Sequence, residues 1–343
     1  MKTTIIPVSN KKNWNAIIQK AAFYDFYHCN SYNAIEDTGE PLLFVTENEE
    51  GDFIAFPIVI RSIAGSVYFD CTSVYGYPGP VASKAIADMS AVLISYFQQQ
   101  FLEFLYDRKV VAAFSRLHPV FEQCLLLSQY GEIISLNKTV AIDLSLPLDI
   151  QRQRYRRSNK SEINQLRKGG YVVKKMDSKT EVDSFADIYI ETMKRVNAIE
   201  HYFFSREYFH RFLSAEDFTA FLLLAYKEDQ LTAGAVFTVT NNIMQYHLAG
   251  TKEQYMKATP MKLVLDEARL LGTKMGLRFL HLGGGVGGSN DDSLYRFKSG
   301  FSDIYFTYKV WRVIVDDIKY KELVAINLRE RKLNTNYFPL YRG

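Results

Sequence analysis

At 343 residues the chain is longer than one ordinary domain, so its length favours two domains. Hydrophobic residues make up 48% of the sequence and charged residues 23%, which excludes an intrinsically disordered protein. The net charge of +3 is too small to argue for or against nucleic-acid binding.

The cysteines and the apolar segments restrict the class of protein further. Cys29, Cys71 and Cys124 are scattered and odd in number, so they provide neither a disulfide framework nor a metal-binding spacing. The N-terminus has no signal-peptide pattern, and no apolar run approaches the ~18 residues needed to span a bilayer. We therefore expect a soluble, cytoplasmic protein without a structural metal.

The first half alternates between predicted strands and amphipathic helices. Apolar spacing predicts helices over 10–27 and 84–106 and strands over 41–46, 53–61, 66–70, 110–114 and 139–144. Between them lies SVYGYPGP, residues 73–80, whose glycines and prolines forbid regular structure and hold Tyr75 and Tyr77 in a rigid turn. Such a turn serves either as a binding surface or as packing at a domain seam.

A second candidate binding segment follows the strand predicted over 110–114. Arg116 and His118 come just after this strand, and open α/β sheets bind ligands beyond strand ends. A histidine beside a proline is more often a turn residue whose hydrogen bonds are satisfied than a catalyst, so both interpretations of His118 stay open. Pro147 marks the predicted seam, which gives expected domains of 1–145 and 146–316.

The second half is predicted to contain a three-stranded meander between helices. Helices are expected over 151–168, 180–197, 205–213, 261–275 and 317–331, and strands over 171–176, 219–226, 232–240, 242–249, 277–282 and 303–315. The first helix carries seven cations and one acid, which indicates either a solvated face or a helix that contacts phosphates. Arg195 either complements the dipole at the end of its helix or contacts an anionic substrate.

A glycine-rich stretch follows the strand predicted over 277–282. Glycines at 283–285 and 287–288 permit tight turns and close approach of a ligand to the backbone. The polar residues at 290–292 predict the cap of a short helix that carries Arg296 and Lys298. Two interpretations stay open here: a site for an electron-rich ligand, or a mobile loop with surface cations.

The order of elements in the second half resembles that of the GNAT acyltransferase fold, in which strands equivalent to 242–249 and 277–282 splay apart and admit the acyl donor. The whole chain resembles the FemABX-like branch of that superfamily. The resemblance is carried by SVYGYPGP at 73–80, RLHP at 116–119, the arginine-rich helix at 152–168, TMKRVNA at 192–198, YFFSREYF at 202–209 and SLYRFKSGF at 293–301. It implies an α/β (α+β) protein of two tandem GNAT-like domains, each a mixed, mostly antiparallel sheet flanked by helices.

The resemblance also implies an activity. The expected enzyme is a cytoplasmic acyltransferase that forms an amide between an aminoacyl or acyl group and a free amine of a cell-wall or surface-polysaccharide precursor. Its acceptor would be linked to a nucleotide or a lipid, and its co-substrate would be aminoacyl-tRNA or acyl-CoA, with no tightly bound cofactor. Domain 1–145, with 317–343 packed back on it, would hold the acceptor, and 146–316 would hold the donor.

One departure from the superfamily bears on the donor. GNAT enzymes bind the pyrophosphate of CoA on a loop of pattern R/Q-x-x-G-x-G/A, whose N–H groups and helix dipole attract the anion. The matching segment here, QYMKAT at 254–259, has no glycine, and Pro260 removes one N–H. This favours aminoacyl-tRNA over acyl-CoA, although Lys257 remains available for a phosphate.

The expected mechanism is direct attack of an amine on an ester or thioester carbonyl. Lys298 matches the family's FK lysine and is predicted to stabilise the tetrahedral oxyanion, a role worth ~3–4 kcal/mol elsewhere; it could instead hold a phosphate or the 3′ end of tRNA. His118 and His281 are weak candidates for a general base. The other predicted contacts are Arg116, His118, Arg195, Tyr75 and Tyr77 for the acceptor, and Tyr246, Gly283, Gly284, Gly285, Arg296 and Phe297 for the donor.

Two further functions compete with this prediction. One is an acetyl-CoA-dependent N-acetyltransferase that acts on an amino sugar. The other is a non-catalytic, tRNA-binding GNAT-like protein that uses the helix at 151–168, and the small net charge argues against it. The oligomeric state is left open by the sequence.

Overall fold

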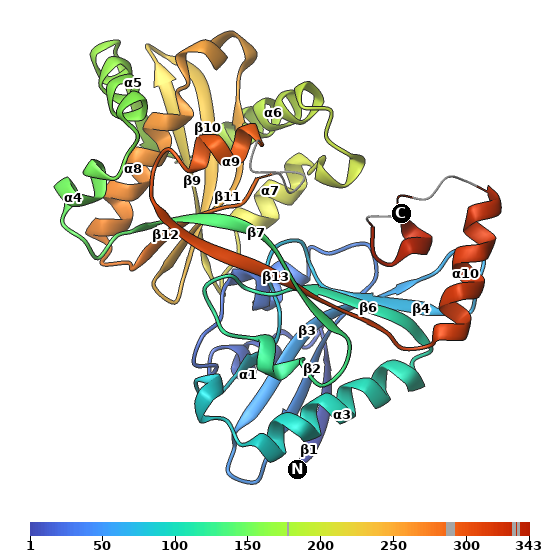
Figure 1. The fold of residues 1–343 in the computed structure, drawn as a ribbon. Coiled ribbons are helices and arrows are strands. Elements are labelled where there is room, and N and C mark those ends of the chain that lie inside the picture. Colours follow the sequence, from blue (N-terminus) through green and yellow to red (C-terminus); the bar gives the residue numbers. More distant parts are fainter. Residues whose placement is uncertain (177, 286–291, 331–333, 335–336) are drawn as a thin grey trace. The chain divides into compact units, whose positions relative to one another are not determined.

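A computed structural model describes residues 1–176, 178–285, 292–330, 334 and 337–343 (Figure 1). The chain divides into two compact units. Unit 1 comprises residues 1–136 and 307–343, and unit 2 comprises residues 137–306. The change of unit therefore falls within two strands, whereas the limits expected from the sequence, residues 145 and 316, lie just beyond the ends of those strands.

Unit 1 contains a mixed, mostly antiparallel sheet. Its strands, in spatial order, are β1 (Lys2–Pro7), β2 (Glu40–Glu47), β3 (Phe53–Ser62), β4 (Phe69–Thr72), β6 (Val110–Arg116) and β13 (Ile304–Ile314), and β5 (Val81–Ala82) pairs with β3. Only β4 and β6 run parallel among these pairs. The β2–β3 hairpin turns at Gly51, whose φ of +84° suits glycine, and the Asn48 side chain accepts the N–H of Asp52.

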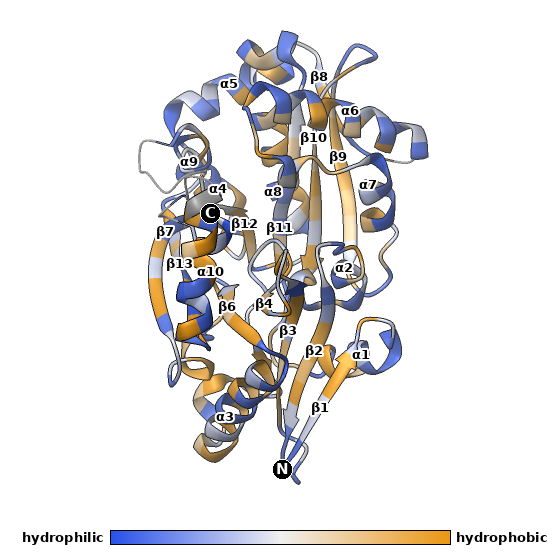
Figure 2. Cartoon of the chain, turned by 90° about the vertical axis from the view of Figure 1, so that its right-hand side faces the viewer, coloured by the Kyte–Doolittle hydropathy of each residue, from blue (hydrophilic) through white to orange (hydrophobic). Residues whose placement is uncertain are grey.

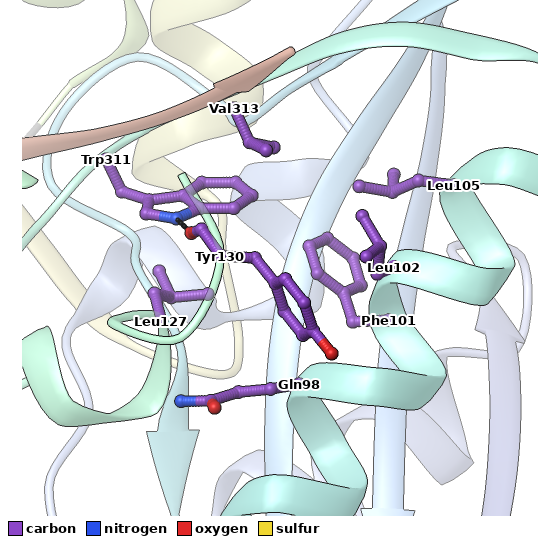
Figure 3. A pocket seen from close by; sticks show the side chains of 8 residues that line it. All are labelled: Gln98, Phe101, Leu102, Leu105, Leu127, Tyr130, Trp311 and Val313. Atoms are coloured by element: carbon purple, nitrogen blue, oxygen red, sulfur yellow. Dashed lines mark hydrogen bonds between the residues drawn. The ribbon is translucent and has the colours of Figure 1, made fainter. Parts of the chain in front are cut away.

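The helices of unit 1 are α1 (Lys11–Ile18), α2 (Asn30–Asn33), α3 (Ala91–Asp107) and α10 (Asp317–Glu330). The apolar face of α3 packs on the sheet, where Phe101 contacts Phe44, Phe56 and Trp311. A small pocket of about 10 Å³ lies beside α3, where Phe101, Leu105, Tyr130 and Trp311 are among the residues that line it (Figure 3). The helix predicted over 10–27 ends at Ile18 instead, and Asp25 caps a separate 3-10 turn at Phe26–His28.

The C-terminal residues belong to unit 1. Asp70 is fully buried between the guanidinium groups of Arg61 and Arg342, and Tyr341 is buried beside Tyr320. Among the described residues, none of the helices combines the length and the apolar character that crossing a bilayer requires.

Unit 2 contains the predicted meander within a mixed, mostly antiparallel group of strands. Its strands, in spatial order, are β7 (Glu132–Asp143), β12 (Phe279–Gly283), β11 (Ile243–Thr251), β10 (Gln230–Thr240), β9 (Thr219–Lys227) and β8 (Tyr171–Lys175). Only β11 and β12 run parallel. Asn241 and Asn242 connect β10 to β11 with φ values of 45° and 64°, as a tight hairpin turn requires.

Unit 2 also carries the helices α4 (Leu148–Gln153), α5 (Arg157–Lys168), α6 (Lys179–Arg195), α7 (Arg206–Leu213), α8 (Met261–Lys274) and α9 (Ser293–Lys298). In Figure 2, β9 and β10 are largely hydrophobic, whereas hydrophilic residues predominate on α7. Together the two units confirm the predicted architecture of mixed, mostly antiparallel sheets flanked by helices.

The arginine-rich segment differs from the single helix predicted over 151–168. It breaks into α4 and α5 because Tyr155 turns inward, packs against Phe301 and is buried. Arg152 and Arg167 both donate to the buried carboxylate of Asp266 on α8, at 2.8 and 2.9 Å. These two cations therefore hold the segment to the domain, and neither interpretation of the sequence pattern had assigned them that role.

Candidate active site

The strands β11 and β12 separate at the centre of unit 2. Their parallel ladder covers only three registers, from Ile243 with Phe279 to Gln245 with His281. Beyond the last register β11 continues to Thr251, whereas β12 ends at Gly283, whose φ of +73° turns the chain away. The two strands thus diverge between Tyr246 and the glycines that follow β12.

Lys298 places its ammonium at this divergence. The residue is only 7% exposed, and its Nζ donates to the carbonyl oxygen of Gly284 at 2.6 Å. The same Nζ lies 5.6 Å from the centre of the Tyr246 ring. The side chain therefore bridges β11 and the end of β12, out of bulk water.

The environment of Lys298 changes its protonation. Burial lowers the pKa of this lysine from 10.5 to about 7, although the charge of Asp292 acts in the opposite direction. Near neutral pH the group is therefore divided between ammonium and amine. Burial also raises the pKa of Tyr246, so its phenol stays neutral.

The helix α9 orients Lys298. Asp292 caps it, as its carboxylate accepts the N–H groups of Leu294 and Tyr295 at 2.7 and 3.0 Å. A Cβ at Gly285 would lie 2.6 Å from the Asp292 carboxyl carbon, so the close approach requires glycine here. The predicted cap residues Asn290 and Asp291, and Gly287 and Gly288, lie outside the described residues.

The other predicted donor residues lie on both sides of this lysine. Gly283 and Gly284 surround its Nζ, and a Cβ added to Gly283 would lie 3.4 Å from it. Phe297 packs against Phe301 with ring centres 5.5 Å apart, whereas Arg296 is exposed. His281 is fully buried, with its Nδ1 2.6 Å from the side-chain oxygen of Gln245 at the end of the ladder.

The N-terminus of α8 follows β11 and carries the segment compared above with the pyrophosphate loop. Residues Glu253–Ala258 form a 3-10 helix, and Thr259 adopts a left-handed φ of 54°. The N–H groups of Lys262, Leu263 and Val264 all donate to the carbonyls of Thr259 or Pro260. Since Pro260 has no N–H, this turn offers few free donors to an anion.

In unit 1, His118 is buried with both ring nitrogens engaged. Its Nε2 lies 3.0 Å from a carboxylate oxygen of Asp25, and its Nδ1 accepts the N–H of Val120 at 3.2 Å. Its ring stacks on Phe121 at 4.0 Å. The side chain has no exposed surface.

The loop at 73–80 is held by aromatic packing and by one amide. Tyr77 lies 5.9 Å from the Tyr27 ring and 5.5 Å from Tyr308, measured between ring centres. Tyr75 accepts a hydrogen bond from Tyr32 through its carbonyl oxygen at 2.8 Å. The buried Gln123 donates to the carbonyls of Pro78 and Pro80 at 3.1 and 2.9 Å.

The two predicted arginines differ in their surroundings. Arg116 is the last residue of β6 rather than lying beyond it, and its guanidinium lies 5.5 Å from the Phe114 ring. Within the described parts of the chain it forms no ion pair. Arg195 ends α6, where its Nη2 donates to the Thr192 hydroxyl at 3.3 Å, and Thr192 also accepts the N–H of Thr251 at the end of β11. The predicted acceptor residues are thus divided, with Arg195 in unit 2 and the others in unit 1.

Comparison with known proteins connects this geometry to a family. Residues 153–299 match the model of the acetyltransferase (GNAT) domain, and this match includes the diverging strands, α8 and Lys298. Over this part of the chain the protein is similar to a GNAT acetyltransferase domain. No curated protein matches the sequence.

Solved structures resemble this chain over most of its length. FemX has a TM-score of 0.69 at 12% identity, covering 94% of this chain and 99% of its own. L-PGS from Bacillus licheniformis has a TM-score of 0.61 at 11% identity, covering 94% and 98%. The C-terminal domain of a putative lysylphosphatidylglycerol synthetase from Agrobacterium fabrum has a TM-score of 0.54 at 14% identity, covering 86% and 91%. The predicted FemABX-like fold is confirmed.

Sequence reasoning missed several residues that hold the candidate segments of the two units in place. Gln123 holds the loop at 73–80, and Asp25 pairs with His118, but nothing in their local sequence distinguishes these two residues from surface residues. Glu162 of α5 reaches the N-terminus of α8, where its carboxylate accepts from Thr259 at 3.0 Å and from Lys262 at 2.5 Å. The sequence signal that could have indicated Glu162 is that it is the single acid in a segment with seven cations.

Proposed function

We propose that the protein is a cytoplasmic aminoacyltransferase, which transfers an aminoacyl group from aminoacyl-tRNA to a free amine of a cell-wall or surface-polysaccharide precursor. The observation that carries the proposal is the buried Nζ of Lys298, held between Gly284 and Tyr246 where two strands diverge. A cationic donor that is shielded from bulk water is suited to an oxyanion that forms during amide synthesis.

The proposed reaction needs no covalent enzyme intermediate. The neutral acceptor amine attacks the ester carbonyl of the donor, and the new C–N bond converts the carbonyl oxygen into an oxyanion. Lys298 donates a hydrogen bond to that oxygen. When the tetrahedral intermediate collapses, the C–O bond to the tRNA ribose breaks, and the proton lost by the amine is transferred to the leaving hydroxyl. An ammonium has three N–H donors, of which the Gly284 carbonyl takes one.

The N-terminus of α8 supports the choice of donor. Its first N–H groups already donate to Thr259 and Pro260, so a pyrophosphate would meet few unpaired amides. An aminoacyl ester of tRNA has no pyrophosphate and does not need this cradle. In this proposal the donor ester lies at Lys298, where β11 and β12 diverge. Gly283–Gly285 and Tyr246 lie beside the aminoacyl group, and the exposed Arg296 lies near the nucleic acid.

The acceptor is proposed to carry an anionic phosphate, as a nucleotide- or lipid-linked precursor does. Arg116, with no acid partner among the described residues, and Arg195 are the proposed contacts for this charge, and Tyr75 and Tyr77 are proposed to flank the acceptor. Two of the structural neighbours are named as a lysylphosphatidylglycerol synthetase domain and L-PGS, and these names fit an aminoacylated envelope component.

Incubation with charged tRNAs or acyl-CoAs and envelope precursors, followed by mass spectrometry, tests the proposal. We expect one amine to gain the mass of an aminoacyl group in the presence of charged tRNA, and Lys298→Met to abolish the gain. Transfer from acetyl-CoA with micromolar CoA affinity would instead support the amino-sugar N-acetyltransferase, which the description of the matched family favours. Tight tRNA binding that Lys298→Ala does not change, without transfer to any amine, would support the non-catalytic alternative.

A further inference from the structure

The N-terminus of α8 is already occupied by an acid of the protein itself. Glu162 projects from α5, and a single carboxylate oxygen accepts both the Thr259 hydroxyl and the Lys262 ammonium. Thr259 directly precedes Pro260 and the first turn of α8, where the helix dipole favours negative charge. The carboxylate therefore lies beside the helix end to which GNAT enzymes bind pyrophosphate.

The protonation of Glu162 keeps a full negative charge at this position. Partial burial raises the pKa of the carboxyl group, but the hydrogen bonds from Lys262 and Thr259 and the charge of Lys262 outweigh it, so the pKa is lowered overall. Lys262 is only 9% exposed. Without Glu162, its ammonium would attract a phosphate. Its charge is neutralised by Glu162 at 2.5 Å.

We infer that Glu162 is a specificity-determining residue that excludes coenzyme A and other pyrophosphate-bearing donors from α8. This inference rests on the proposed function, in which the donor is an ester without a pyrophosphate. A pyrophosphate at the helix end must either lie against the carboxylate, where like charges repel, or displace it from Thr259 and Lys262. Removing the charge of Glu162 alone would release Lys262 for an anion, while the left-handed Thr259 and Pro260 stay unchanged.

Isothermal titration with coenzyme A and with inorganic pyrophosphate tests the inference. Glu162→Gln keeps the size of the side chain and an acceptor oxygen but removes the charge. Glu267→Gln on α8 is the matched control, because it makes the same change at an acid that pairs with Arg167. We expect Glu162→Gln to bind both probes at least ~10-fold more tightly than the wild type, which corresponds to ~1.4 kcal/mol, and Glu267→Gln to match the wild type.

The outcomes separate this inference from the proposed function. If neither the wild type nor folded Glu162→Gln binds coenzyme A, the inference is wrong and the aminoacyl-tRNA proposal stands. If the wild type binds coenzyme A with micromolar affinity, both are wrong. An equal gain in Glu267→Gln would reveal a general charge effect and would also overturn the inference. Glu162→Ala, checked by circular dichroism, replaces Glu162→Gln if that variant does not fold.

Discussion

Replacing Lys298 by methionine is expected to stabilise the protein while it removes activity. Burial lowers the pKa of Lys298 from 10.5 to about 7, so the folded chain holds its ammonium at a cost. The difference between these two values gives about 4 kcal/mol at pH 7. Methionine avoids that cost but leaves the Gly284 carbonyl without its donor, a loss of about 1–3 kcal/mol. We expect a net gain of about 1–3 kcal/mol in the free energy of unfolding.

The pH dependence of stability provides the decisive measurement. Because the folded pKa is lowered, the unfolded chain binds more protons between pH 7 and 10.5, so the free energy of unfolding of the wild type gains a contribution that rises across this interval. Lys298→Met lacks the group, so its advantage should shrink as the pH approaches 10. Urea unfolding at pH 7, 8.5 and 10 measures both chains, with Lys257→Met as the control at an exposed lysine. A constant difference between wild type and Lys298→Met at all three pH values would refute the reasoning.

Three further predictions concern catalysis and the two units. If the protonated Lys298 stabilises the oxyanion, the kcat/KM of the wild type should fall above about pH 7 as Lys298 loses its charge, whereas arginine stays charged. The kcat/KM of Lys298→Arg, divided by that of the wild type, should therefore rise with pH, and a constant ratio would contradict that role. Gly76→Ala should destabilise unit 1 by ~2 kcal/mol or more in urea unfolding, since φ is +120° and the new Cβ would lie 2.0 Å from the Tyr27 ring; unchanged unfolding would show that the loop relaxes freely. Asp266→Ala should cost ~3 kcal/mol by leaving Arg269 buried without its acid, and a thermal melt equal to that of Glu267→Gln would exclude this.

The parts of the fold that the sequence could predict are those set by local chemistry. The meander β9–β11 follows from runs of apolar residues and from Asn241–Asn242, and α9 follows from the capping acid Asp292. The expectation that Lys298 meets the diverging strands came from the family resemblance, because neither spacing nor composition places a lysine against a glycine carbonyl 14 residues away.

The features of the fold and the site that the sequence did not predict depend on contacts between residues that are distant in sequence. His118 pairs with Asp25, 93 residues earlier, and the local sequence around either residue does not indicate this contact. The attachment of the arginine-rich segment to α8 depends on Asp266, more than 90 residues later. A change of unit inside a continuous strand leaves no mark in hydropathy, because a strand keeps its alternation on both sides of the change.

The passage of β13 into unit 1 has a consequence for synthesis on the ribosome. Unit 1 begins the chain, yet its strand β6 pairs with residues 310–314 of β13, which are translated after all of unit 2. Multidomain chains generally fold from the N-terminus as they emerge. Here, however, strands β7 to β12 of unit 2 are all translated before unit 1 has its last strand. During that interval β6 presents an unpaired edge, so the nascent N-terminal half is the part of this protein most exposed to misassociation and to chaperones.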